Sequence, residues 1–157
     1  MAEIFLLRHA HAEPASPGQD DSSRALSELG LRQARQAAEW LLPRLKQPLV
    51  LVSPALRCQQ TWHALQAGLS HVIKKDVAAI YDASPGMLVD VLAKHTAEQI
   101  LLIGHNPGLE TTCALLHSGR SNEARGMPTA AVGHLRINAG QAVEPGCAEL
   151  LEFWWPG

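Results

Sequence analysis

The sequence lacks several features that mark particular classes of protein. Its three cysteines are an odd number and form no C-x-x-C pair, so we expect no disulfide framework and infer a reducing compartment. It contains no lysine- or arginine-rich run, and its net charge is −2, which argues against nucleic acid as the main partner. No apolar run approaches the roughly 18 residues that a membrane-spanning helix needs. We therefore expect no contact with a membrane.

The start of the chain carries no basic segment followed by an apolar stretch, so we expect no signal peptide and a cytoplasmic location. The 157 residues are 46% hydrophobic and 18% charged, which is the composition of a globular protein. Residues 1–157 are predicted to form a single domain that buries a core without disulfides, metal or another cofactor. The oligomeric state cannot be predicted.

Short apolar runs alternate with segments of helical periodicity. The runs at 4–7, 49–52 and 100–103 predict buried strands. Ser27 is a suitable N-cap for a first helix, which Pro43 should end or kink. Further helices are predicted over about 55–67, from Pro85, and over 109–117. Segment 71–81 is ambiguous and could hold a short strand, and two more strands are predicted near 130–137 and 148–155.

This alternation predicts an α/β fold: a three-layer sandwich with a mostly parallel central sheet and helices on both faces. Binding sites in such sheets form beyond the carboxyl ends of the strands. The first apolar run ends in Arg8-His9, and the run at 100–103 ends in Gly104-His105. The run at 49–52 ends just before Arg57. These residues are therefore the candidates for a functional site.

The residue types at these strand ends suit phosphoryl transfer. A neutral imidazole such as that of His9, expected to be exposed at a strand end, can attack phosphorus and form a covalent intermediate. The guanidinium groups of Arg8 and Arg57 could bind the charged equatorial oxygens, and His105 could add a donor. Each segment alone has a plainer explanation, because an Arg-His pair is more often a surface dipeptide and Gly-His-Asn-Pro is usually only a turn.

Other residues give weaker signals. His9 and His11 could contact a metal, but no carboxylate lies at a spacing that completes a site, and no metal is expected. The remaining histidines are interpreted as surface or satisfied core residues. Cys58, although it follows Arg57, is interpreted as a core residue.

Taken together, these segments resemble the histidine phosphatase superfamily. The resemblance is carried by residues 7–10 (LRHA), 53–61 (SPALRCQQT) and 103–108 (IGHNPG), in that order. Residues 24–34 are similar to the family's first helix entry, and residues 127–132 (MPTAAV) to a late strand of its SixA branch, the phosphohistidine phosphatases. The resemblance covers nearly the whole chain. Ala10 stands where many members have glycine, which implies an ordinary backbone conformation there.

The resemblance implies a phosphoglycerate mutase-like fold and a set of site residues. His9 would be the phosphorylated nucleophile, and Arg8, Arg57 and His105 would form the phosphate pocket with it. Arg24 would reach the phosphate or its neighbour, although a helix-entry arginine is often only a surface charge.

The general acid is left open between two residues. Asp82 lies in the region where larger members carry an acidic residue, and Glu13, in the loop after the nucleophile, is its rival. The plainer interpretation of Asp82 is a carboxylate at the start of a helix.

The substrate is predicted from the leaving group. An alkyl alcohol needs a proton as it departs, whereas imidazole, with a pKa of about 6.5, can leave already protonated. The chain also has no long lid insertion, which suits a phosphate presented on another protein. We therefore predict a metal-independent phosphatase that acts on phosphohistidine of a partner protein. The alternatives are a phosphatase for small phosphate esters and a phosphate-binding module without turnover. The second alternative is disfavoured because Arg8, His9, Arg57 and His105 are all intact.

Overall fold

The computed structural model describes residues 2–138 and 140–157. A six-stranded sheet in the order β3-β2-β4-β1-β5-β6 forms its centre. Strands β3, β2, β4 and β1 run parallel, and β5 and β6 are added antiparallel at one edge. The elements are β1 (Glu3–Arg8), η1 (Asp21–Ser23), α1 (Glu28–Leu41), β2 (Leu49–Val52), α2 (Leu56–Gln66), β3 (Lys74–Asp76), η2 (Ala78–Ile80), α3 (Pro85–Ala93), β4 (Gln99–Gly104), α4 (Gly108–Ser118), η3 (Ser121–Glu123), β5 (Val132–Ile137) and β6 (Ala148–Trp154).

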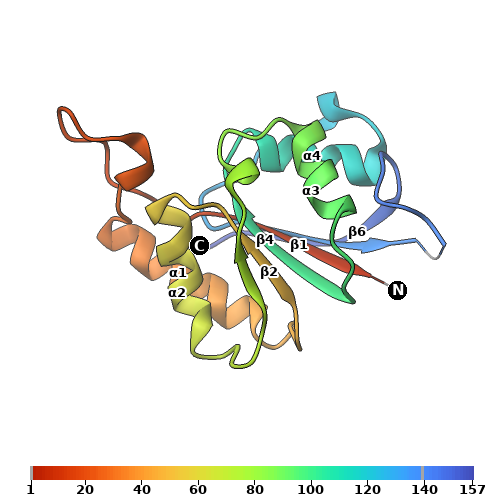
Figure 1. The fold of residues 1–157 in the computed structure, drawn as a ribbon, viewed down its shortest axis with the longest axis horizontal. Helices are drawn as coiled ribbons and strands as arrows, with labels where there is room; N and C mark the ends of the chain where they lie inside the picture. Colours follow the sequence, from red (N-terminus) through yellow and green to blue (C-terminus); the bar gives the residue numbers. More distant parts are fainter. Residues whose placement is uncertain (1, 139) are drawn as a thin grey trace.

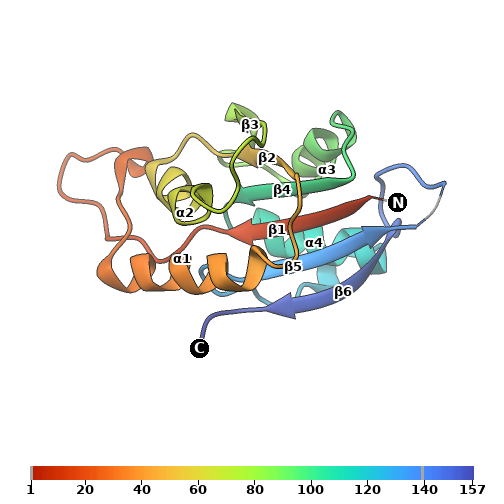
Figure 2. The ribbon, with the colours of Figure 1, turned by 90° about the horizontal axis from the view of Figure 1, so that it is seen from below.

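Two pairs of helices cover the two faces of the sheet. Helices α1 and α2 lie on one side, and α3 and α4 lie on the other (Figures 1 and 2). Successive side chains of β1 point to opposite layers: Phe5 and Leu7 pack in the core beneath α1 and α2, whereas Ile4 and Leu6 pack beneath α3 and α4. A strand buried on both faces reads as a continuous apolar run. The predicted three-layer fold with a mostly parallel sheet is thereby confirmed.

Local signals explain where the helices begin and end. The Ser27 hydroxyl accepts a hydrogen bond from the Gly30 N–H at 3.0 Å and caps α1, which ends before Pro43. Ser84 caps α3 in the same way, with Pro85 in the first turn. The ambiguous segment 71–81 holds the short edge strand β3, whose sequence, Lys-Lys-Asp, has no apolar pattern because its side chains are largely exposed.

Three neighbouring strands end side by side and deliver the candidate site residues together. Arg8 of β1 is paired with Gly104 of β4, and Val52 of β2 with Ile103. The residues that follow are therefore adjacent: His9 donates its N–H to the Gly104 carbonyl at 3.0 Å, and Ser53 donates its N–H to the Ile103 carbonyl at 3.1 Å. Sites in parallel sheets form at this end of the strands.

The backbone after His9 is held by both helices of one layer. The Ala10 N–H donates to Thr61 Oγ1 of α2 at 3.0 Å, and the His11 N–H donates to Gln33 Oε1 of α1 at 2.9 Å. At Gly30, in the first turn of α1, a Cβ atom would lie 1.9 Å from the His11 carbonyl oxygen. Glycine is needed there because any side chain would force α1 away from this loop.

Of the helices in the described residues, none is both long and apolar enough to cross a membrane.

Candidate active site

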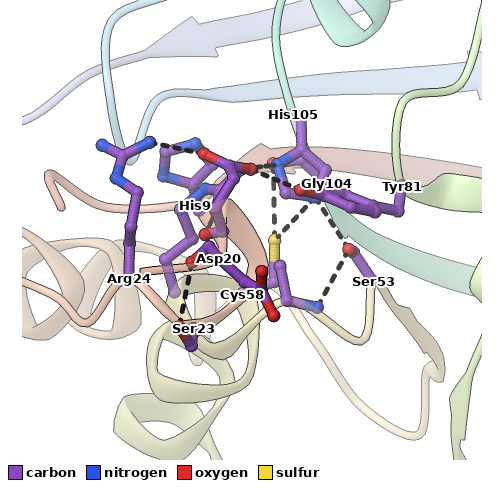
Figure 3. A network of polar contacts seen from close by, with 12 residues as sticks. His9, Asp20, Ser23, Arg24, Ser53, Cys58, Tyr81, Gly104 and His105 are labelled. Atoms are coloured by element: carbon purple, nitrogen blue, oxygen red, sulfur yellow. Dashed lines mark hydrogen bonds and ion pairs between the residues drawn. The ribbon is translucent and has the colours of Figure 1, made fainter. Parts of the chain in front are cut away.

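His9 lies directly beyond β1, facing a second histidine. Its ring centroid is 5.4 Å from that of His105, and the two rings are tilted by 58° (Figure 3). The expectation that His9 would be exposed is wrong, because only 9% of the residue is accessible to solvent. The ring is enclosed because the backbone on both sides of it is bonded to other strands and loops, with the His9 carbonyl accepting from the Ala130 N–H at 3.0 Å.

The hydrogen bonding of His9 fixes which ring nitrogen is free. Nδ1 lies 2.7 Å from the carbonyl oxygen of Ala10, which can only accept, so Nδ1 carries the proton and Nε2 has an unshared lone pair. Burial lowers the pKa of His9 to about 3, and the nearby charges of Arg57 and Arg8 act in the same direction. The imidazole is therefore neutral near pH 7, as a nucleophile must be.

His105 follows β4 and is held from two sides. Its Nδ1 lies 3.2 Å from Arg57 Nη2, which can only donate, so the Nε2 atom carries the proton and donates to Ser53 Oγ at 2.7 Å. Burial, followed by the charge of Arg57, lowers the pKa of His105 to about 4. The sequence suggested that His105 donates to phosphate oxygens. In this arrangement its one N–H is instead directed to Ser53, and its lone pair supports Arg57.

Arg57, in the first turn of α2, connects the histidine to an acidic residue that the sequence did not point to. Nη2 donates to Asp21 Oδ2 at 2.9 Å, and Nη1 donates to the Asp21 carbonyl oxygen at 2.9 Å. The Arg57 side chain is 7% exposed, whereas that of Asp21 is 50% exposed. The buried guanidinium at the base of the site is thus paired with an anion on a surface loop.

Arg8 is the last residue of β1 and directly precedes His9. Its Nη1 donates to the Met127 carbonyl oxygen at 2.7 Å. Its Nε, like that of Arg57, is buried without a hydrogen-bond partner among the described residues. The charges of Arg8 and Arg57 both act on the His9 ring, so the end of the sheet beside His9 is electropositive.

Asp21 also binds two other side chains. Arg24 Nη1 donates to Asp21 Oδ1 at 2.9 Å, and the Tyr81 hydroxyl donates to Oδ2. These hydrogen bonds, Tyr81 first, followed by Arg24 and Arg57, hold the pKa of the Asp21 carboxyl well below its usual range. Asp21 is therefore ionised and cannot act as a proton donor. Nothing in its local sequence, Gln-Asp-Asp-Ser-Ser, distinguishes it from Asp20.

The other sequence candidates lie farther out. Arg24 is half-buried, and its Nε donates to the Glu13 carbonyl at 2.8 Å, so it reaches the site only through Asp21. Asp82 has an exposed side chain and a φ of 55°, the left-handed conformation that aspartate tolerates in turns. Its negative charge nevertheless acts on His105 and partly opposes the lowering of the pKa of that ring. Glu13 is exposed in the loop after His9.

Buried small side chains complete the base of the site. Thr61 Oγ1, which accepts from the Ala10 N–H, donates to the Arg57 carbonyl at 2.7 Å and so links the nucleophile loop to α2. Cys58 is buried, and its sulfur lies 3.5 Å from His105 Nε2. Burial raises the pKa of this thiol to about 12, so it is not a nucleophile. Within residues 2–138 and 140–157, no group of three or more histidine, cysteine or acidic side chains could hold a metal ion.

Comparisons with known proteins agree with this geometry. The sequence model of the histidine phosphatase superfamily (branch 1) matches residues 4–80. No curated protein matches the chain at a significant level. A solved structure assigned as the phosphohistidine phosphatase SixA of Agrobacterium tumefaciens is 29% identical, with a TM-score of 0.83 over 99% of this chain and 98% of that one. A structure assigned as SixA of Nakamurella multipartita is 25% identical, with a TM-score of 0.83 over 99% of this chain and 96% of that one.

A third similar structure is that of the protein histidine phosphatase SixA in complex with tungstate. It has a TM-score of 0.81 and 23% identity, over 98% of this chain and 96% of that one, and shows the shared fold. The sequence model, the strand order and the paired histidines at the strand ends agree with one another. Residues 4–80 match the sequence model of the histidine phosphatase superfamily, and 99% of the chain shares the fold of structures assigned as SixA proteins.

Proposed function

We propose that this protein is a phosphatase that forms a covalent phosphohistidine on His9 and removes phosphate from phosphohistidine of a partner protein. The observation that carries the proposal is the arrangement of His9: a neutral ring whose Nδ1–H is bound to the Ala10 carbonyl, leaving the Nε2 lone pair free beside two arginines. A positioned nucleophile next to a charge clamp is what metal-independent phosphoryl transfer requires.

The reaction proceeds in two displacements. His9 Nε2 attacks phosphorus, a new N–P bond forms, and the bond from phosphorus to the leaving group breaks. Water then attacks the phosphorylated His9, releasing inorganic phosphate and restoring the free Nε2. The guanidinium groups of Arg8 and Arg57, whose charges act on His9, bind the equatorial oxygens, where charge accumulates in both steps. Neither step needs a metal ion.

The substrate class follows from how little acid catalysis the site offers. Asp21, the carboxylate that contacts the arginines, is ionised and accepts hydrogen bonds. Asp82, the proposed general acid, is exposed in a turn. An alkoxide leaves poorly without a proton, whereas an imidazole departs readily because it is a much weaker base. The structures assigned as phosphohistidine phosphatases among the relatives support the same substrate.

A direct comparison of substrates tests this proposal. We expect kcat/KM for a protein phosphorylated on histidine to exceed that for a simple alkyl phosphate by about 10²-fold or more, the range that general acid catalysis supplies. Release of inorganic phosphate measures both reactions on one enzyme preparation. A higher kcat/KM for the alkyl ester would instead identify a small-molecule phosphatase. If neither substrate were turned over, the protein would be a phosphate-binding module.

The role of Asp82 is tested by measuring how much the Asp82→Asn substitution lowers kcat/KM for substrates with different leaving groups. If Asp82 is the general acid, Asp82→Asn lowers kcat/KM for an alkyl phosphate by about 10²–10⁴-fold and kcat/KM for phosphohistidine much less. The comparison uses kcat/KM because kcat also contains hydrolysis of the phosphorylated His9, a step common to all substrates.

Glu13→Gln serves as the matched carboxylate variant. Equal losses on both substrates in Asp82→Asn would contradict the assignment of Asp82 as general acid. A loss confined to Glu13→Gln would transfer the role to Glu13.

A further inference from the structure

The carboxylate of Asp21 occupies a position where donors from three separate parts of the chain converge. Its Oδ2 accepts from Arg57 Nη2 at 2.9 Å and from the Tyr81 hydroxyl, and its Oδ1 accepts from Arg24 Nη1 at 2.9 Å. Two of these donors border the paired histidines: Arg57 Nη2 lies 3.2 Å from His105 Nδ1, and the Tyr81 ring centroid lies 5.3 Å from that of His105.

The donors are less exposed than the acceptor. Arg57 is buried on α2. Tyr81 follows η2, and its ring centroid lies 5.9 Å from the guanidinium carbon of Arg57. Asp21 instead belongs to the short η1 turn, within residues 13–23, which are all exposed. An oxygen site whose donors lie on buried or half-buried residues, and whose acceptor lies on an exposed loop, can exchange one anion for another.

We propose that the position of Asp21 Oδ2 is an oxyanion subsite for the substrate's phosphoryl group, and that Tyr81 is a substrate-binding residue. When phosphate enters, Asp21 leaves, and both Arg57 Nη2 and the Tyr81 hydroxyl donate to a phosphoryl oxygen in its place. This proposal rests on the proposed function, because it extends the phosphate pocket around His9. The exchange is favoured electrostatically because a phosphate dianion carries more charge than the carboxylate that it replaces.

Asp21 is then a competitor of phosphate, and this determines how Tyr81 must be tested. In the free protein the hydroxyl donates to Asp21, and in the complex it donates to phosphate. Tyr81→Phe removes both hydrogen bonds, so its effect on phosphate affinity in the otherwise unchanged protein is small. The contribution of Tyr81 is measured in an Asp21→Ala background, where no carboxylate competes for the hydroxyl.

The experiment is a titration of the full chain with inorganic phosphate, in which calorimetry measures the dissociation constant. The titration is repeated with tungstate. We expect Asp21→Ala to bind phosphate about 10-fold tighter or more, since it removes both a competitor and a negative charge. Asp20→Ala, which removes the same charge one residue away, is the matched control and should change affinity much less. Adding Tyr81→Phe to Asp21→Ala should weaken phosphate binding by about 10-fold or more, as for a hydrogen bond to a charged group.

A spectroscopic signal can report the contact directly. Tyr81 is the only tyrosine in the chain, so labelling with 3-fluorotyrosine gives a single ¹⁹F resonance. Addition of phosphate to the Asp21→Ala protein should shift this resonance with the same dissociation constant that calorimetry gives.

Three results would overturn the proposal. Weaker phosphate binding in Asp21→Ala would show that the carboxylate positions Arg57 and does not compete. Equal affinities of Asp21→Ala with and without Tyr81→Phe would show that Tyr81 does not touch phosphate, as would an unchanged ¹⁹F resonance. Failure of the proposed function can be distinguished from failure of this subsite proposal, because it is measured by turnover of phosphohistidine. The phosphate affinity of Arg57→Ala shows independently whether phosphate binds beside His9.

Discussion

Replacing His9 with alanine is expected to reduce turnover by at least about 10⁴-fold, the range seen when a covalent nucleophile is removed from an enzyme. The effect should be this large because no other side chain at the site can take over. Cys58 is a buried neutral thiol, and the lone pair of His105 is bound to Arg57. Phosphate release from a phosphohistidine protein measures the loss. Incubation with labelled substrate should yield an acid-labile phosphoenzyme in the wild type and none in His9→Ala.

The His9→Ala protein should remain folded. The Nδ1 hydrogen bond of His9 is made to its own neighbour, and the backbone bonds to Gly104 and Ala130 do not depend on the side chain. We expect a change of no more than about 2 kcal/mol in the free energy of unfolding. His63→Ala, an exposed histidine on α2, is the control and should retain full activity. Turnover and a phosphoenzyme in a folded His9→Ala protein would exclude the covalent mechanism.

The second large effect is expected at Arg57. Arg57→Ala should lower kcat/KM by about 10²–10³-fold, the value of one charged or hydrogen-bonding group aimed at the transition state. Stability should fall by about 1–3 kcal/mol, because the truncated side chain is buried and leaves His105 Nδ1 without a donor, whereas Asp21 is solvated once released. Activity and thermal unfolding of one preparation separate the two effects. Arg35→Ala, which removes an exposed arginine from α1, controls for the loss of one positive charge.

Arg57→Lys distinguishes charge from geometry. Lysine keeps the positive charge but lacks the planar fork with which the guanidinium holds His105 and an oxyanion in fixed directions. We therefore expect a partial recovery of activity, between that of Arg57→Ala and the wild type. Full activity in Arg57→Lys would show that a point charge is enough, and normal activity in Arg57→Ala would remove Arg57 from the pocket.

The sequence predicts the frame of the site better than its contacts. Strands β1, β2 and β4 are visible as apolar runs because they are buried on both faces, and their ends mark Arg8, His9 and His105. The strand β3 could not be predicted firmly, since an exposed edge strand imposes no apolar pattern. The cap at Ser27 and the position of Pro85 in the first turn of α3 are local signals, and both predictions are confirmed.

The polar network around Arg57 could not be predicted. Asp21 meets Arg57 across 36 positions of the sequence and Tyr81 across 60, and Ser53 meets His105 across 52. Such pairings depend on the relative placement of the loops, which no local propensity encodes. Asp20 and Asp21 have the same composition around them, and only the fold selects the second for the arginine.

The position of β1 inside the sheet has a consequence for biosynthesis. This first strand is paired with β4 and β5, with Glu3 opposite Gln99 on one side and Arg136 on the other. Contacts this distant in sequence form slowly, and during synthesis the apolar segment around Phe5 must wait for partners made much later. His9 gains its last backbone bond from Ala130. A growing chain on the ribosome therefore carries the nucleophile without a complete pocket until Ala130 and the residues around it have been made.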